Sequence, residues 1–263
     1  MAGDLFDRRL RALRRDRAAR MGCELFLFDR AFEDCLERLR GIAGTFDRAL
    51  LLGCPSPDWV GRLREFASRV EVADPGPIFA SRSLGRTVEE DRYDFGRAEF
   101  DLCVTVGTLD TVNEMPVALQ LLQRALRDDA PFLGAIPGGD SLPSLRASLT
   151  AAGRSQGIVA ARTHPRIEPS ALAGLLLSAG FATPVVDVDR VSITYPSLSV
   201  LIRDLRAMGV TNMLASRPPP WTRGSFAMAE QAFCELGDGQ RTSETVEILH
   251  FFGRARRMRP LAG

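Results

Sequence analysis

Residues 48–58 read RALLLGCPSPD, and this stretch sets the fold that the rest of the chain has to satisfy. An apolar run over residues 49–52 stops at Gly53, and Trp59 and Leu63 then follow with helical spacing. Buried strand, tight turn and helix in this order are typical of the first βα unit of a nucleotide-binding sheet.

The loop after Gly53 is unusual for such a unit. Ligand loops are rich in glycine because the backbone needs positive φ and a close approach to the ligand. Here Cys54, Pro55, Ser56 and Pro57 follow Gly53. Each proline fixes φ near −65° and lacks an N–H donor. Losing one or two hydrogen bonds of about 1 to 1.5 kcal/mol each predicts roughly tenfold to a few hundredfold weaker ligand binding.

Composition sets limits on the function. The 263 residues fit one large α/β domain with an inserted lobe, and the net charge of +1 gives no reason to expect nucleic acid as a partner. All 34 basic residues are arginine, which excludes lysine Schiff-base chemistry. The five cysteines form no CxxC pair, so we expect no metal site, no disulfide framework and a cytoplasmic protein. No apolar window is long enough to predict a membrane span.

Further strands alternate with helices along the chain. Four more segments read as strands: FDLCVTVG at 100–107, PFLGAI at 131–136, TPVVDVDRVSITY at 183–195 and TVEILHFFGR at 245–254. This order predicts an α/β fold with a parallel sheet and helices on both faces. Ligands of such sheets bind at the carboxyl ends of the strands, where Gly53, Asp74, Gly107 and Gly138 are expected.

Two acidic segments fall at this edge. Asp74 ends the strand predicted at 70–73, where a carboxylate can accept bonds from two ribose hydroxyls, although ADPG can equally be a simple turn. Glu89, Glu90 and Asp91 form a cluster that can meet a nucleoside amino group, but a solvated loop is the favoured interpretation.

The first 20 residues carry a run of basic side chains. Seven arginines share this segment: Arg8, Arg9, Arg11, Arg14, Arg15, Arg17 and Arg20. A solvated amphipathic helix is the favoured interpretation. A helix that lies over the domain or contacts an acidic partner stays open, and the acidic residues in the segment argue against a mitochondrial presequence. We expect structural roles for His164 and His250.

Two helices are predicted at 197–208 and 223–236, with a proline-rich break between them, and their position before the last strand suggests a lid. The expected organisation is an N-terminal helical cap at 1–45, a core at 46–195, the lid at 196–242, and a final strand with a tail at 243–263.

The order of elements resembles the seven-stranded, Rossmann-like sheet of class I S-adenosylmethionine-dependent methyltransferases. Segments 6–20, 100–119, 132–149 and 193–212 are similar to the mitochondrial complex I assembly factors that have a methyltransferase domain. Those proteins are in turn similar to the malonyl-ACP O-methyltransferase of biotin synthesis. The GGDSL turn at 138–142 is specific to this group.

The resemblance implies S-adenosylmethionine as cofactor and assigns it Gly53, Cys54, Asp74, Glu89 and Gly107. The chain departs from the family at several positions. Of the glycine motif only Gly53 is kept, Leu51 replaces the usual acid, and Asp110 and Thr111 replace a histidine and a tryptophan. These departures predict weak or absent cofactor binding.

Three functions follow from the resemblance. The first is a working methyltransferase with an unknown acceptor, positioned by Asp140, Arg146 or Tyr195. The second is a non-catalytic assembly factor whose partner is an acyl carrier protein or a respiratory complex I subunit. The third is arginine hydroxylation, which the mitochondrial relatives imply; it ranks last because no pattern in the sequence indicates an iron site. We expect a methyltransferase-fold protein with reduced or lost activity.

Overall fold

The structure is a computed structural model. It describes residues 3–42, 44–154, 157, 161–216, 219–220 and 222–256.

A seven-stranded sheet forms the centre of the molecule. Its strands are β1 (Phe46–Leu52), β2 (Ala67–Asp74), β3 (Arg86–Thr87), β4 (Leu102–Val106), β5 (Pro131–Pro137), β6 (Phe181–Tyr195) and β7 (Thr242–Ala255). They lie in the order β3-β2-β1-β4-β5-β7-β6. The first five strands run parallel, and β7 is antiparallel to both of its neighbours. The expected seven-stranded α/β fold is confirmed. The sheet is mixed rather than wholly parallel, because the terminal strand β7 lies between β5 and β6 and is antiparallel to both.

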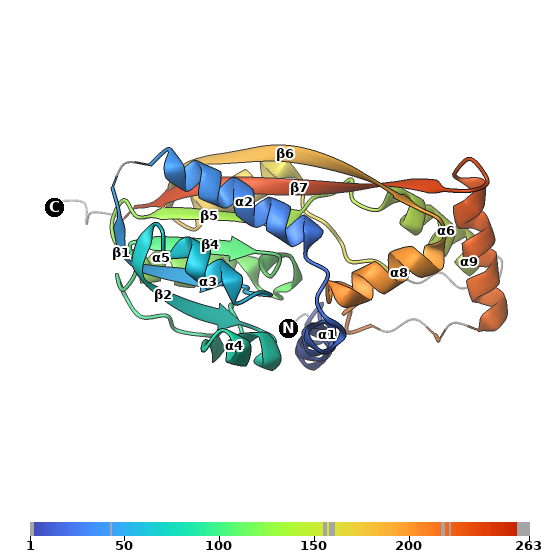
Figure 1. Cartoon of the computed structure of the whole chain (residues 1–263), viewed down its shortest axis with the longest axis horizontal. Helices are drawn as coiled ribbons and strands as arrows, with labels where there is room; N and C mark the ends of the chain where they lie inside the picture. The colour runs from blue at the N-terminus through green and yellow to red at the C-terminus, as the bar shows by residue number, and fades with distance from the viewer. Residues whose placement is uncertain are drawn as a thin grey trace.

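Helices cover both faces of this sheet (Figure 1). They are α1 (Arg8–Met21), α2 (Phe26–Arg40), α3 (Asp58–Leu63), α4 (Pro77–Arg82), α5 (Met115–Ala125), α6 (Pro143–Arg154), α7 (Pro169–Ser178), α8 (Leu198–Ala207) and α9 (Arg223–Glu235), with a short 3-10 turn η1 (Leu109–Thr111). None of the helices in the part of the chain that the structure describes has the length and hydrophobicity needed to cross a bilayer.

Side chains along the buried strands point alternately to the two faces of the sheet, so the core has two layers. Ala49 and Leu51 of β1 pack against α2 and α3, where the rings of Phe32 and Trp59 stack with centroids 4.2 Å apart. Leu50 and the other side chains that point to the opposite face pack against α5 and α7. A continuous apolar strand is therefore buried on both faces, as parallel sheets require.

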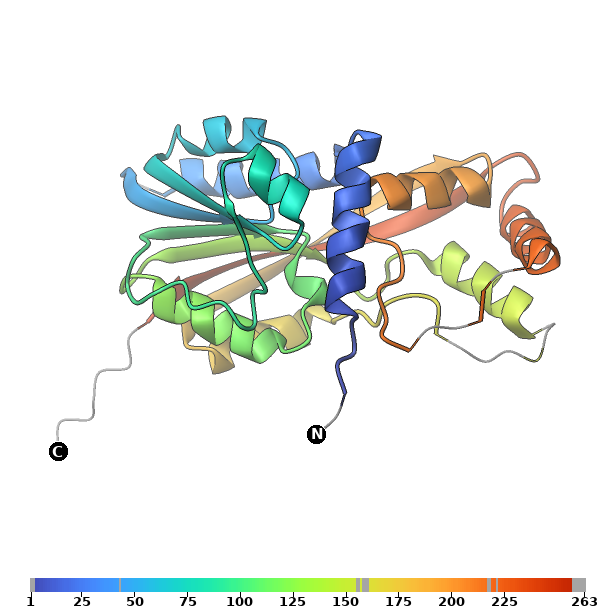
Figure 2. The same ribbon diagram turned by 90° about the horizontal axis from the view of Figure 1, so that it is seen from below.

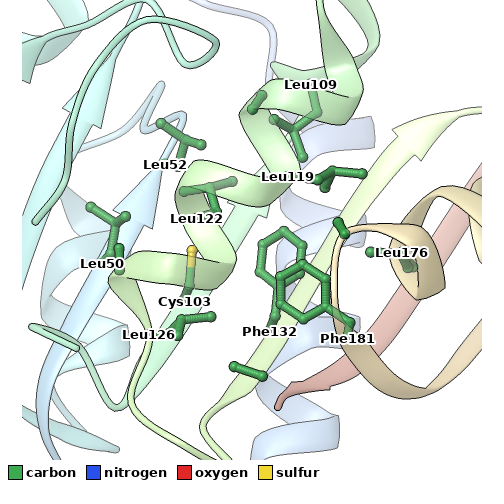
Figure 3. Close-up of a cluster of buried hydrophobic side chains, with 14 of the residues drawn as sticks. Leu50, Leu52, Cys103, Leu109, Leu119, Leu122, Leu126, Phe132, Leu176 and Phe181 are labelled. Carbon is green, nitrogen blue, oxygen red and sulfur yellow. The ribbon is translucent and has the colours of Figure 1, made fainter. Parts of the chain in front are cut away.

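Figure 3 shows the second layer, in which side chains from β1, β4, β5, α5 and α7 meet. The rings of Phe132 and Phe181 stack there with centroids 4.7 Å apart. This layer anchors β5 and β6, so it also supports the long hairpin that these strands share with β7.

The β6 and β7 strands extend well beyond the parallel strands (Figure 1). Helices α6, α8 and α9 pack on this extension through a third apolar cluster, which includes Leu145, Tyr195, Leu201 and Phe233. The two helices that precede the last strand therefore sit beside α6, at the end of the molecule away from β3.

Two features differ from the sequence expectation, which placed the helix at 59–68 and the following strand at 70–73. The helix after the Gly53 loop ends at Leu63 and β2 begins at Ala67, because residues 64–66 form a turn whose last carbonyl accepts a bond from Phe46 N. The short strand β3 was not predicted, since two polar residues carry no periodic signal.

Close packing around Gly134 of β5 makes it a sensitive position. A Cβ there would overlap the Thr105 carbonyl oxygen and the Phe251 ring. We expect Gly134→Ala to lower the free energy of unfolding by about 1–3 kcal/mol, because the backbone of β4 cannot move aside. Chemical denaturation measures this change.

The matched control is Gly174→Ala, because nothing lies within 4 Å of a Cβ built at this position in α7. It should stabilise the protein by about 0.5–1 kcal/mol. Equal effects of the two substitutions would contradict the packing of β5 described above.

Candidate functional site

Helix α1 lies across the carboxyl edge of the parallel strands. Figure 2 shows it in dark blue, between the sheet and the helices of the β6–β7 extension. The Asp7 side chain caps the helix by accepting a bond from Leu10 N, and the backbone of Phe6 pairs with the Asn113 side chain. Phe6 lies just before α1, and Asn113 follows β4. Their two hydrogen bonds therefore tie the start of α1 to the edge of the sheet.

Asp74, at the end of β2, is fully buried and bound by Arg15 of α1. Its Oδ1 accepts bonds from Arg15 Nε at 2.8 Å and Gly76 N at 2.7 Å. Its Oδ2 accepts bonds from Arg15 Nη2 at 2.5 Å and Cys54 N at 2.9 Å. Burial opposes the charge on Arg15, but the Asp74 carboxylate outweighs it and raises the arginine pKa.

Arg11 forms a second buried fork one turn earlier. Its Nη1 and Nη2 donate to the two oxygens of Glu90 at 2.6 and 2.8 Å, and Nη2 also donates to Thr108 O at 2.6 Å. Nε donates to Thr111 Oγ1 at 3.0 Å. Glu90 is fully buried, and it is the fork geometry of a guanidinium that satisfies both of its oxygens.

Arg8 completes the set nearer the start of α1. It donates to both oxygens of Asp91, at 2.6 and 2.7 Å, and more weakly to Glu89 at 3.3 Å. Burial tends to raise the Asp91 pKa, but the bonds from Arg8 and from Glu114 N lower it overall. We call Arg8, Arg11 and Arg15, with the acids they bind, the arginine clasp.

The arginine clasp overturns two sequence interpretations. The N-terminal helix is not simply solvated, since Arg11 and Arg15 are buried, and the acids at 90 and 91 are buried rather than in a solvated loop. The three arginines are spaced i, i+3 and i+7, which places them on one face of a helix. That spacing was visible in the sequence, but nothing in it showed which acids this face would meet.

The loop after β1 keeps its turn. Gly53 has φ of 81°, and a Cβ there would lie 2.6 Å from the Thr108 methyl group. Cys54 is fully buried, and burial raises the pKa of its thiol to about 11, so it is not a thiolate nucleophile at neutral pH. Gly107 has φ of 65° and faces the ring of Phe28.

In this arrangement the edge does not fit an adenosyl group at Asp74. An ionised carboxylate has about four lone-pair positions. Asp74 fills them with two bonds from Arg15 and one each from Cys54 N and Gly76 N. No acceptor remains for the ribose hydroxyls that the sequence assigned to this residue.

The other sequence-predicted residues do not converge. The side chain of Glu89 is 42% exposed and lies between Arg8 and Arg92. Asp140 is also exposed, and its nearest cation, Arg190, is 3.4 Å away.

The two remaining acceptor candidates also lie apart. Tyr195 is buried among lid side chains, where burial and the nearby Asp204 raise its pKa. Arg146 donates to Gly139 O at 2.7 Å and lines a cavity of about 440 Å³, which neither Asp140 nor Tyr195 lines. The three candidates therefore do not form one acceptor site.

Both histidines are buried. His164 Nε2 accepts a bond from Met213 N at 2.8 Å, and the His164 ring packs edge-on against Phe6. Burial, with a smaller effect of Arg166, lowers the His164 pKa to about 4. Among the described residues, no group of three or more histidine, cysteine or acidic side chains is placed to hold a metal ion.

Comparisons with known proteins give relatives over most of the chain. The arginine-hydroxylase NDUFAF5 of Rattus norvegicus is 30% identical over 95% of this chain and 77% of its own length. A malonyl-[acyl-carrier protein] O-methyltransferase of Laribacter hongkongensis is 30% identical over 72% of this chain and 68% of its own. No family model matches the chain.

A solved structure supports the fold. A putative methyltransferase of Bacillus halodurans superposes with a TM-score of 0.57 at 11% identity, covering 85% of this chain and 100% of its own. Together with the sheet order, this match identifies the fold as that of the class I S-adenosylmethionine-dependent methyltransferases.

Removing Arg15 should be costly for stability. Arg15→Met leaves the Asp74 charge buried without its cation, and we expect the free energy of unfolding to fall by about 3–5 kcal/mol. Adding Asp74→Asn to this variant should recover part of the loss, because no buried charge then remains. Chemical denaturation measures both.

The control for this prediction is Arg20→Met, on the same helix and exposed. We expect its effect to stay within about 0.5 kcal/mol. Similar stability of the Arg15→Met and Arg20→Met proteins would contradict the buried pair.

Acid should destabilise the protein partly through His164. Between its folded pKa of about 4 and the ordinary value of 6.5, the unfolded chain binds a proton that the folded chain does not. Stability therefore falls as the pH is lowered through this window, by up to about 3 kcal/mol. His164→Gln should make the pH dependence shallower by that amount in unfolding experiments between these two pH values. Parallel curves for the two proteins would rule out this contribution.

Proposed function

Because the chain belongs to the family of the arginine-hydroxylase NDUFAF5, which also includes the malonyl-ACP O-methyltransferase relative, we propose that it is a methyltransferase-fold assembly factor for respiratory complex I. It acts by holding a protein partner, and it does not transfer a methyl group from S-adenosylmethionine. One observation carries this proposal: the four hydrogen bonds that saturate Asp74, two of them from Arg15.

The loop between β1 and α3 supports the same conclusion. Pro55 and Pro57 have no N–H group, and the N–H of Cys54 already donates a hydrogen bond to Asp74. A cofactor carboxylate or sugar approaching this loop therefore meets few free backbone donors. The sequence suggested weaker cofactor binding because of the two prolines alone. The position of α1 is a second obstacle, because Arg15 occupies Asp74.

The outer face of α1 is the surface we assign to the partner. Arg9, Leu13 and Arg20 are exposed there, while the arginine clasp holds the opposite face in place. Cationic side chains around an apolar one favour an acidic partner surface. We assign that partner to a complex I subunit, with an acyl carrier protein as the second candidate.

We also propose a reducing, cytoplasmic compartment. All five cysteines are free thiols, and Cys35, Cys54 and Cys103 are buried. Free buried thiols are usual where disulfides do not form.

A working methyltransferase is the second candidate function. The positive φ values of Gly53 and Gly107 are those of a ligand loop, and a relative is named as an O-methyltransferase. In that case α1 moves away from Asp74 when cofactor binds. Of the three acceptor candidates, Arg146 is the one that lines a cavity together with α1, and the acceptor then binds there.

Calorimetric titration with S-adenosylmethionine and S-adenosylhomocysteine separates the two functions. For the wild-type protein we expect no binding at about 1 mM ligand, equivalent to an affinity weaker than about 4 kcal/mol. Micromolar binding would overturn the proposal and establish the second candidate. Arg15→Gln is the informative variant: binding that appears only in this protein would show that α1, and not the proline loop, blocks the edge.

Complementation tests the assembly role. Deleting the gene in its host should lower the NADH:quinone oxidoreductase activity of membranes, and the wild-type gene should restore it. Arg9→Glu/Arg20→Glu, which reverses the charge on the outer face of α1, should restore several-fold less activity. The control is Arg69→Glu, because Arg69 lies on β2 with its side chain 72% exposed. Normal complex I activity in the deletion strain would refute the proposal.

A further inference from the structure

A cavity of about 440 Å³ lies between α1, α6 and α8, away from the Asp74 edge. Its lining is unusually basic. Six arginines contribute to it: Arg14 and Arg17 from α1, Arg146 from α6, Arg162 and Arg166 from the segment before α7, and Arg206 from α8. These residues are far apart in the sequence, so only the folded chain brings their charges together.

Acidic side chains do not balance this charge within the cavity. None of its described lining residues is aspartate or glutamate. Arg166 has a counter-charge in Asp110, whose carboxylate lies 3.4 Å away and does not line the cavity. Three of the arginines donate to neutral oxygens: Arg17 to Thr211 Oγ1 at 2.9 Å, Arg146 to Gly139 O at 2.7 Å, and Arg162 to Pro219 O at 3.0 Å. Each guanidinium has five N–H groups, and a single bond from Arg17 or Arg146 uses only one of them.

Arg17 is destabilised in its charged form by burial and by the neighbouring arginines. Its Nε is buried and has no hydrogen-bond partner among the described residues. Burial, followed by the charges of Arg14 and Arg206, lowers its pKa to about 10. His164, also in the lining, is neutral at physiological pH because its pKa is about 4, so it neither adds to nor offsets the positive charge. An anion within the cavity would relieve the repulsion and satisfy the buried donor.

The remaining walls limit what that anion can be. Apolar side chains from α6 and α8, including Leu145, Ile202 and Leu205, line the cavity beside the arginines. Its volume is in the range of small-molecule sites and far too small for a nucleic acid. A cationic group, such as the side chain of a peptidyl arginine, would be repelled.

We propose that this cavity binds a small organic polyanion, a compound with two or more carboxylate or phosphate groups on a compact body that contacts the apolar wall. The ligand joins α1 to α6 and α8 by contacting arginines from all three helices. The lining of this cavity does not include Gly53, Asp74 or Gly107, the residues assigned to S-adenosylmethionine.

Titration of the full chain tests this site, with citrate as the carboxylate probe and pyrophosphate as the phosphate probe. Sodium chloride at matched ionic strength measures the nonspecific effect of salt. We expect at least one probe to bind with a dissociation constant below about 1 mM and to raise the melting temperature above the chloride value. The stronger probe identifies which anionic group the arginines prefer.

Two variants in the cavity lining test the site, and a third variant outside the lining is the control. Arg17→Gln and Arg206→Gln should each weaken binding about tenfold or more, since each removes a charged donor. Arg206 is exposed, so its replacement should leave the fold intact. Arg203→Gln removes an exposed arginine of the same helix that does not line the cavity, and it should change binding less than about twofold.

Two results would overturn the proposal. One is the absence of binding by both probes at about 10 mM, beyond the effect of matched chloride. The other is an equal loss in Arg203→Gln and Arg206→Gln, which would show that the anions bind the positive surface of α8 in general.

Discussion

The buried ion pair between Arg15 and Asp74 is the interaction on which the arrangement of the site depends. A carboxylate at the end of β2 has lost its water, so it needs several strong donors to remain charged. Arg15 supplies two of them and the backbone at Cys54 and Gly76 supplies the others. The two bonds from Arg15 hold α1 over the edge, and the four bonds together leave Asp74 without an acceptor for a ligand.

The position of α1 links two parts of the molecule with different chemistry. One face carries the arginine clasp and closes the carboxyl edge of the parallel strands. The neighbouring face carries Arg14 and Arg17 into the basic cavity beside α8. The same helix therefore contributes arginines to two places, Asp74 and the cavity.

The family relationship and the site give different information. The sheet order and the relatives place the chain in a methyltransferase fold. Function lies in the site that a fold carries. At this site Pro55 and Pro57 follow Gly53 and supply no N–H donor, and the Asp110 carboxylate lies 3.4 Å from Arg166. A fold retained with its edge closed is consistent with a protein that works through its surface.

The sequence by itself determined the fold. Continuous apolar strands such as residues 102–106, the break at Gly53 and the alternation with helices predict the parallel part of the sheet, β1 to β5, with helices on both faces. It also identified Asp74 as a special residue. The partners of that residue, and the assembly of six arginines around one cavity, were decided by tertiary structure. Charge pairing joins residues far apart in the chain, as in Arg15 with Asp74, and no local pattern states which acid a given arginine will reach.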